Sequence, residues 1–85
     1  MNEELQRFHQ RPIGEQVRII RQRLRLSQSE IGRRLGISQA AVSQMETGGA
    51  EYTRGETVRR VAQALGVSEL HGGLIPPWIG GQEDW

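Results

Sequence analysis

The sequence contains no cysteine, and every Lys or Arg position is an arginine, eleven in all. The absence of cysteine excludes disulfide bonds and thiolate metal sites. The two histidines, His9 and His71, are too few for a His-based metal site unless carboxylates complete it, so we expect neither a metal nor another cofactor. No apolar run approaches the roughly 18 residues of a membrane-spanning helix, and the N-terminus is polar. A cytoplasmic location is therefore expected.

A chain of 85 residues has room for one modest hydrophobic core and for no separate catalytic or ligand-binding domain. A domain of this size buries only roughly 60% of the surface that its unfolded chain exposes. The sequence has no glycine-rich phosphate-binding motif, and neither histidine lies beside a nucleophile in a recognised pattern. An enzyme is therefore the least favoured class of protein.

The formal net charge of +1 conceals an uneven distribution. Residues 7–34 contain eight arginines and two glutamates, a local balance of +6, whereas the charged residues from position 66 onward are all acidic. Such segregation suggests one surface that faces a polyanion. Taken by itself, the charge favours the alternative of a solvated helix face.

Apolar periodicity and capping residues predict an all-α fold with four or five short helices and no strand. From position 13 to about 25 the large apolar residues recur at spacings of four, three and four, which indicates an amphipathic helix. Ser27 and Glu30 have the spacing of a capping box at the start of the next helix. Ser38 caps a third helix, and a second capping box, residues 53–56, begins a fourth. The residues expected to point inward are Ile13, Val17, Ile20, Leu24, Ile31, Leu35, Val42, Met45, Val58, Val61, Ala62 and Leu65.

The chain divides into three parts by composition. Residues 1–11 form an N-terminal extension in which a short helix is possible, residues 12–71 form the main domain, and residues 72–85 form a C-terminal tail. Ser68 is expected to cap a short fifth segment before the tail. Two adjacent prolines and two adjacent glycines then favour an irregular tail.

Residues 28–35 and 39–46 are two short helices joined by a three-residue turn that begins with Gly36. This arrangement is the helix-turn-helix unit, whose second helix enters the major groove of DNA. The second helix has only Val42 and Met45 as large apolar residues, so most of its surface is free for contacts. Gly32, in the first helix, is expected to allow the close contact that the second helix requires.

The stretch LSQSEIGRRLGISQAAVSQMETG, residues 26–48, resembles the helix-turn-helix of the lambda-repressor/Cro-like (XRE-type) family. The likeness continues more loosely over residues 13–70. It departs at Gly32, where the family usually has alanine, and after Glu46, where the loop is longer and lacks Asn-Pro. The resemblance implies a compact four- to five-helix lambda-repressor-like DNA-binding domain. It also implies a small bacterial or phage-encoded repressor that binds a double-stranded, palindromic operator.

Base contacts are expected from the exposed face of the second helix. The resemblance implies that Gln39 reads a base, and a glutamine bonded to adenine through N6 and N7 supplies roughly 1–3 kcal/mol of discrimination. Ala40 can offer its methyl group to thymine, Ser43 can bond a base edge or a phosphate, and Gln44 can reach a later base pair. For each of them the alternative is a solvated surface residue.

Contacts to the DNA backbone should outnumber base contacts, because roughly half to two-thirds of protein–DNA hydrogen bonds go to phosphate and sugar. The resemblance implies that Gln28 contacts phosphate and braces Gln39. It also implies that Arg21 and Glu46 form a partly buried structural ion pair, which orients the second helix. The expected backbone contacts are Gln28, Arg33, Ser38, Thr47 and Arg54.

A homodimer is expected, because one helix-turn-helix covers only a half-site and such proteins read two half-sites about 34 Å apart. The C-terminal segment is the first choice for the dimer surface, since it is too short to bury its apolar residues alone, and Leu5 and Phe8 are the second. Alternatively, Trp78 folds back on its own domain. The residues expected to contact a second copy or another partner are Leu70, Leu74, Ile75, Trp78 and Trp85.

The alternative function belongs to a different class, an antitoxin or adaptor that acts mainly through protein binding. The tail LIPPWIGGQEDW has the aromatic, proline and acidic residues of a segment that orders on a partner. A pure adaptor has no need for Gln28, Gln39 and Gln44 on one polar face, so these glutamines favour the DNA-binding function.

Overall fold

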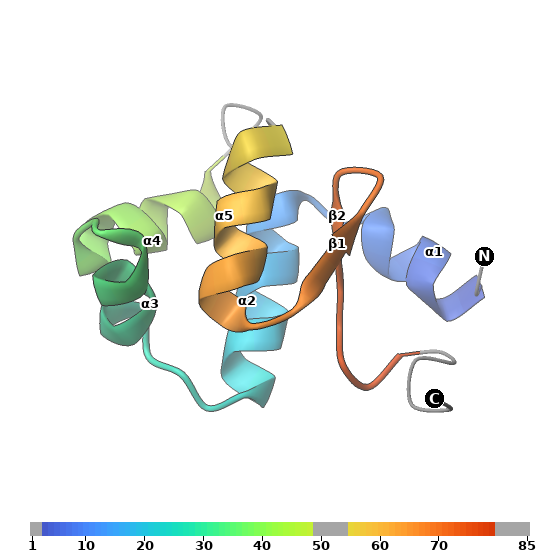
Figure 1. Ribbon diagram of the computed structural model, residues 1–85, viewed down its shortest axis with the longest axis horizontal. Helices are drawn as coiled ribbons and strands as arrows, with labels where there is room; N and C mark the ends of the chain where they lie inside the picture. The colour runs from blue at the N-terminus through green and yellow to red at the C-terminus, as the bar shows by residue number, and fades with distance from the viewer. Residues whose placement is uncertain (1–2, 49–54, 80–85) are drawn as a thin grey trace.

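Five helices and one β-hairpin are formed by the residues that the computed structural model describes, 3–48 and 55–79. In chain order they are α1 (Glu3–His9), α2 (Ile13–Arg23), α3 (Gln28–Leu35), α4 (Gln39–Thr47), α5 (Gly55–Leu65), β1 (Ser68–Leu70) and β2 (Gly73–Ile75). Helices α3 and α4 lie at one end of the molecule and α1 at the other, with α5 and α2 between them (Figure 1). The all-α fold expected from the sequence is confirmed, and the small hairpin is an addition to it.

The core is formed by the inward faces of the helices together with Leu74 of β2 and Ile79. The predicted apolar stripe of α2 is confirmed at Ile13, Val17 and Ile20, which are all buried. Leu24 does not belong to it and is 37% exposed, because α2 ends at Arg23 and Leu24 is its C-cap residue. The largest fully buried side chains are Ile20, Ile31, Leu74, Val17, Val42, Val58, Val61 and Pro76.

Helices α3 and α4 have the capping groups that the sequence predicts. The hydroxyls of Ser27 and Ser38 each accept a hydrogen bond from the backbone N–H three residues later, at 3.0 Å. Gly36 ends α3 in the left-handed region, with φ 75°, which a residue without a Cβ adopts at little cost. Only half of the capping box at Ser27 forms, since the carboxylate of Glu30 binds arginines of its own helix instead of reaching back.

Two glycines let α4 approach its neighbours closely. An added Cβ at Gly32 would lie 2.6 Å from the carbonyl oxygen of Ile37, so the close contact expected at this glycine is confirmed. An added Cβ at Gly14, in the first turn of α2, would lie only 2.2 Å from the carbonyl oxygen of Met45 in α4. Packing of α2 against the end of α4 therefore depends on a glycine that the sequence pattern does not single out.

The expectation of a capped helical segment at Ser68 is wrong, because residues 68–75 form an antiparallel hairpin. His71 and Gly72 make its two-residue turn with φ values of 53° and 80°, and positive φ at both positions is what a type I′ hairpin turn requires. The N–H of Leu74 donates to Oε1 of Gln16 at 2.9 Å. The Leu74 carbonyl oxygen accepts a hydrogen bond from Nε2 of His9 at 2.7 Å. These bonds join the hairpin to α2 and α1.

The hairpin changes which apolar residues are available to a partner. Leu74 is fully buried in its own chain, so its assignment to a dimer surface is wrong. Leu5 and Phe8, the second choice for that surface, are also buried in the core. Trp78 is half-buried against the core, with the guanidinium of Arg23 4.4 Å from its ring centre, which is the folded-back alternative. Leu70 and Ile75 are half-buried as well, whereas Trp85 lies outside the described residues.

Candidate DNA-contact surface

Helix α4 has one buried face and one exposed polar face. Val42, Met45 and Glu46 are buried against the rest of the domain, while Gln39 and Gln44 lie on the opposite, exposed face. Residues at positions i, i+1, i+4, i+5 and i+8 of a helix share one face, and the residues at those positions from Gln39 onward are small or polar. This stripe consists of Gln39, Ala40, Ser43, Gln44 and Thr47, of which only Ser43 is half-buried.

A buried ion pair connects α2 to the end of α4. Nε and Nη2 of Arg21 donate to the two carboxylate oxygens of Glu46 at 2.6 and 3.0 Å. The side chains are 11% and 1% exposed, and Nη1 of Arg21 donates to the Leu26 carbonyl oxygen at 2.9 Å. The two residues that the sequence analysis paired are therefore in contact, and the pair fixes the position of α4 relative to α2.

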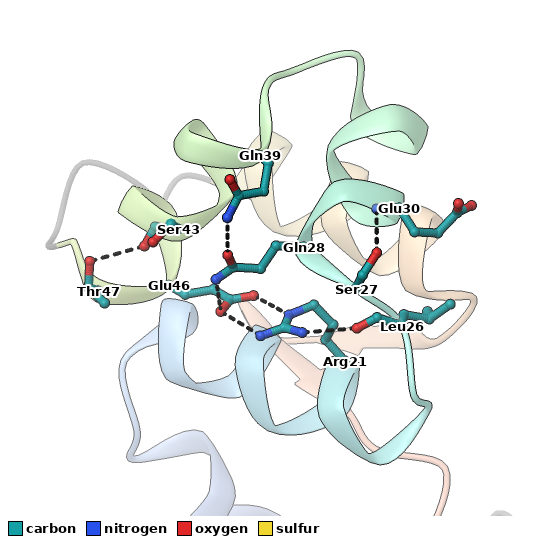
Figure 2. A network of polar contacts seen from close by, with 9 residues as sticks. All are labelled: Arg21, Leu26, Ser27, Gln28, Glu30, Gln39, Ser43, Glu46 and Thr47. Atoms are coloured by element: carbon teal, nitrogen blue, oxygen red, sulfur yellow. Dashed lines mark hydrogen bonds and ion pairs between the residues drawn. The ribbon is translucent and has the colours of Figure 1, made fainter.

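The ion pair continues outward to the surface through two glutamines (Figure 2). Nε2 of Gln28 donates to Oε1 of Glu46 at 3.0 Å. Nε2 of Gln39 in turn donates to Oε1 of Gln28 at 2.6 Å. A continuous series of hydrogen bonds therefore runs from the buried carboxylate to the first residue of α4. The bond between the glutamines is the brace that the resemblance implied, and the bond to Glu46 is new.

The beginnings of α3 and α4 meet at a shallow depression of ≈ 400 Å³. Backbone N–H groups at a helix N-terminus carry partial positive charge and favour anions. Polar side chains border the same depression, so a phosphate group lying there would meet donors from both helices. The lining residues are Arg21, Ser27, Gln28, Ser29 and Gln39.

The other residues expected to contact the DNA backbone differ in whether their side chains already have a partner within the chain. Nη2 of Arg33 lies 2.6 Å from both carboxylate oxygens of Glu30, so its charge is already paired on the surface. The hydrogen bonds from Arg33, and then from Arg34, lower the pKa of Glu30, and the same pairing raises the pKa of Arg33. Both groups are therefore ionised at neutral pH. Thr47 donates its hydroxyl to the Ser43 carbonyl oxygen, and Arg54 lies outside the described residues.

Two arginines that the sequence analysis did not assign to DNA contacts join α3 to α5. Nη1 of Arg34 donates to the Ala64 carbonyl oxygen at 2.8 Å, and Nη2 of Arg60 donates to the Leu35 carbonyl oxygen at 3.0 Å. Both cap the last carbonyls of a neighbouring helix. Part of the positive charge that suggested a polyanion therefore serves the packing of the helices.

Within residues 3–48 and 55–79, no three His, Cys, Asp or Glu side chains lie close enough together to hold a metal ion. In the same residues, no helix combines the length and the apolar character that a membrane span needs.

Two short helices joined by a glycine turn, with an exposed polar stripe on the second, define a helix-turn-helix protein. A family model described as a helix-turn-helix domain matches residues 12–71, and the chain belongs to this family. The P22 c2 repressor, in a crystal structure with a synthetic operator and Tl+, is similar at 33% sequence identity and a TM-score of 0.57. The match covers 68% of this chain and 86% of that one. No curated protein matches the chain.

These matches confirm the resemblance to the lambda-repressor/Cro-like family. The protein is a DNA-binding transcription regulator, and its family is not one of enzymes.

Proposed function

We propose that this protein is a repressor that recognises a specific double-stranded DNA sequence by placing α4 in the major groove. The placement of Gln39 carries the proposal, because it is exposed at the start of α4 and is held by Gln28, which is held by the buried Glu46. An amide that is oriented before binding loses less side-chain entropy when it meets a base. The similar P22 c2 repressor is a protein bound to an operator, which supports the same mode here.

Base recognition is assigned to the first four residues of the exposed stripe of α4. Gln39 has the groups to bond adenine, accepting from N6 and donating to N7. Ala40 supplies a methyl group for contact with thymine, and Ser43 and Gln44 supply hydrogen-bonding groups further along the groove. Their common exposed face supports this assignment.

Backbone contacts are assigned to the ends of the two helices. Gln28 and Ser38 border the beginnings of α3 and α4, where helix N-termini favour phosphate. Thr47 lies at the far end of the same exposed stripe. Arg33, on the outer surface of α3, and Arg54 complete the proposed set.

A homodimer is proposed to place two copies of α4 in successive major grooves, about 34 Å apart. Leu70, Ile75 and Trp78 remain the candidate contact residues, because each is only half-buried within its own chain. Two chains bound per operator in a stoichiometric titration would support this arrangement, and one chain would contradict it. The antitoxin or adaptor function has less surface to use, since Leu74 and Ile79 of its proposed docking segment are buried.

Replacing Gln39 with alanine is expected to weaken the preference for the operator by about 5- to 150-fold while leaving non-specific affinity nearly unchanged. The expected loss of discrimination is about 1–3 kcal/mol, because the bidentate bond to adenine disappears and no phosphate contact is touched. The measurement is binding to DNA from upstream of the protein's own gene and to scrambled DNA, across a salt series.

Gln63→Ala is the matched control, because Gln63 is an exposed glutamine on α5 outside the α4 stripe. It should retain the full preference. Equal binding of the wild type to both DNAs, with affinity that collapses as salt rises, would mean phosphate attraction alone and would contradict the proposed function.

Replacing Glu30 with glutamine is expected to make DNA binding more salt-dependent. The substitution removes the carboxylate that now pairs with Arg33, so this arginine becomes free to neutralise a phosphate. One added phosphate contact steepens the slope of log Kobs against log salt by about 0.9. Glu15→Gln is the control, because Glu15, in the first turn of α2, forms a similar surface pair with Arg11. An unchanged slope in Glu30→Gln would show that Arg33 gains no phosphate contact when its carboxylate partner is lost.

A further inference from the structure

We propose that Glu46 determines which base Gln39 selects, by fixing the direction of the hydrogen bonds that pass through Gln28. This inference rests on the proposed function, in which Gln39 meets a base edge, and it assigns to the buried carboxylate a role in specificity. Glu46 is then a positioning residue, since its side chain is 1% exposed and cannot itself reach DNA.

The direction of the hydrogen bonds is set by two groups, one of which can only donate and the other only accept. A guanidinium has N–H donors and no acceptor, whereas a carboxylate has acceptors and no donor. Arg21 supplies two donors to Glu46 and one to the carbonyl of Leu26, and all three bonds are formed. Oε1 of Glu46 also accepts from Gln28, so the group that faces the glutamine from the core is an acceptor.

Each amide in the series must then adopt one of its two orientations. The two faces of an amide differ only in which end donates, so the partners decide its orientation. Gln28 must turn Nε2 toward Glu46, and its Oε1 therefore points outward. Because this oxygen only accepts, Gln39 must turn Nε2 toward it, and the two atoms lie 2.6 Å apart.

This orientation leaves Gln39 with a defined pair of free groups. One N–H of Nε2 is used by Gln28, so the other N–H and Oε1 remain for DNA. Adenine presents N7 as an acceptor and N6 as a donor, and matches both groups. Guanine presents acceptors at N7 and O6, so Oε1 of Gln39 would face a second acceptor. Adenine is therefore preferred over guanine at this position.

Removing the charge on Glu46 permits the opposite direction. In Glu46→Gln the new amide can accept from Arg21 and donate to Gln28 from its own Nε2. Gln28 can then turn over and donate to Oε1 of Gln39. Both N–H groups of Gln39 become available, and they suit N7 and O6 of guanine. The inference therefore predicts relaxed discrimination in this variant.

The experiment selects preferred sites from a random double-stranded DNA pool, using the full-length wild type and four variants. The position read by Gln39 is the one whose preference disappears in Gln39→Ala. Affinity is then measured on the selected site and on the same site with guanine in place of adenine at that position. The wild type is expected to favour adenine by about 5- to 150-fold, the equivalent of the 1–3 kcal/mol of a bidentate contact. In Glu46→Gln the ratio is expected to fall below about 3-fold.

Two further variants test whether a change in base preference comes from the direction of the hydrogen bonds. The other possible causes are a loss of stability and a shift of α4. Gln28→Met breaks the series of hydrogen bonds but leaves the Arg21–Glu46 ion pair intact. It should lower the preference for adenine over guanine as Glu46→Gln does. It also serves if Glu46→Gln fails to fold. Val17→Ala destabilises the core from a fully buried position of α2 and removes none of the hydrogen bonds of the series, so it should keep the wild-type preference for adenine over guanine.

A wild-type ratio in Glu46→Gln or in Gln28→Met would overturn the inference and leave the proposed function standing. Loss of the ratio in Val17→Ala to the same extent would also overturn it, because general destabilisation would then explain every result. A wild type that selects no sequence from the pool would overturn the proposed function and this inference together.

Discussion

Arg21→Ala is expected to lower the free energy of unfolding by about 3–5 kcal/mol, since loss of one partner leaves the other as an uncompensated buried charge. The carboxylate left behind is that of Glu46, with a side chain only 1% exposed. The Leu26 carbonyl oxygen also loses its donor. For a domain of this size the melting temperature should fall by at least about 12 °C. Thermal unfolding followed by circular dichroism measures the effect.

Arg18→Ala is the matched control, because it makes the same substitution at an exposed position of the same helix. It should change the free energy of unfolding by at most about 0.5 kcal/mol. The double variant Arg21→Met with Glu46→Leu should recover most of the loss, because a buried ion pair can often be replaced by apolar residues of similar volume without cost. An unchanged melting temperature in Arg21→Ala would mean that the pair does not hold α4.

The local part of the fold could be predicted because short-range chemistry specifies it. Ser27 and Ser38 cap their helices through bonds to residues three positions on, and Gly36 provides the left-handed residue between them. The exposed stripe of α4 follows from helical periodicity alone once Val42 and Met45 are assigned to the core. These features need no knowledge of distant segments.

The hairpin could not be predicted on the same grounds. Its strands are three residues long, too short to show the alternation that marks a strand. Leu74 is held by bonds to Gln16 and His9, which lie 58 and 65 positions away. A turn at His71 and Gly72 was the available local signal, but it carries little weight without those distant partners.

The residues of the candidate site could be predicted from the sequence, but the hydrogen bond that links Gln28 to Glu46 could not. Gln28 and Gln39 follow from the motif, since each occupies a fixed position in it, and the Arg21–Glu46 pair follows from the wider family resemblance. The bond from Gln28 to Glu46 depends on side-chain conformations at positions 18 residues apart. It becomes visible only when α3 and α4 are placed together, and it makes a stabilising ion pair the start of a series of hydrogen bonds that ends at Gln39.

Gly14→Ala is expected to destabilise the protein by about 3 kcal/mol, at the upper end of the usual cost of overpacking a core. The new Cβ would lie 2.2 Å from the Met45 carbonyl oxygen and 3.0 Å from that of Glu46. Both atoms belong to the backbone of α4, so no flexible side chain can move aside, and the two helices must separate. Chemical denaturation measures the loss in the free energy of unfolding.

The direction of this effect separates packing from helix propensity. Alanine favours a helix interior by about 0.5–1 kcal/mol over glycine, so propensity alone predicts that Gly14→Ala stabilises. Gly55→Ala is the control, because nothing lies within 4 Å of a Cβ added at the start of α5. That variant should be neutral or slightly more stable. Since the separation forced by Gly14→Ala moves the end of α4 that carries Glu46, operator affinity should fall along with stability. A Gly14→Ala protein as stable as the wild type would show that α2 and α4 can part here without cost.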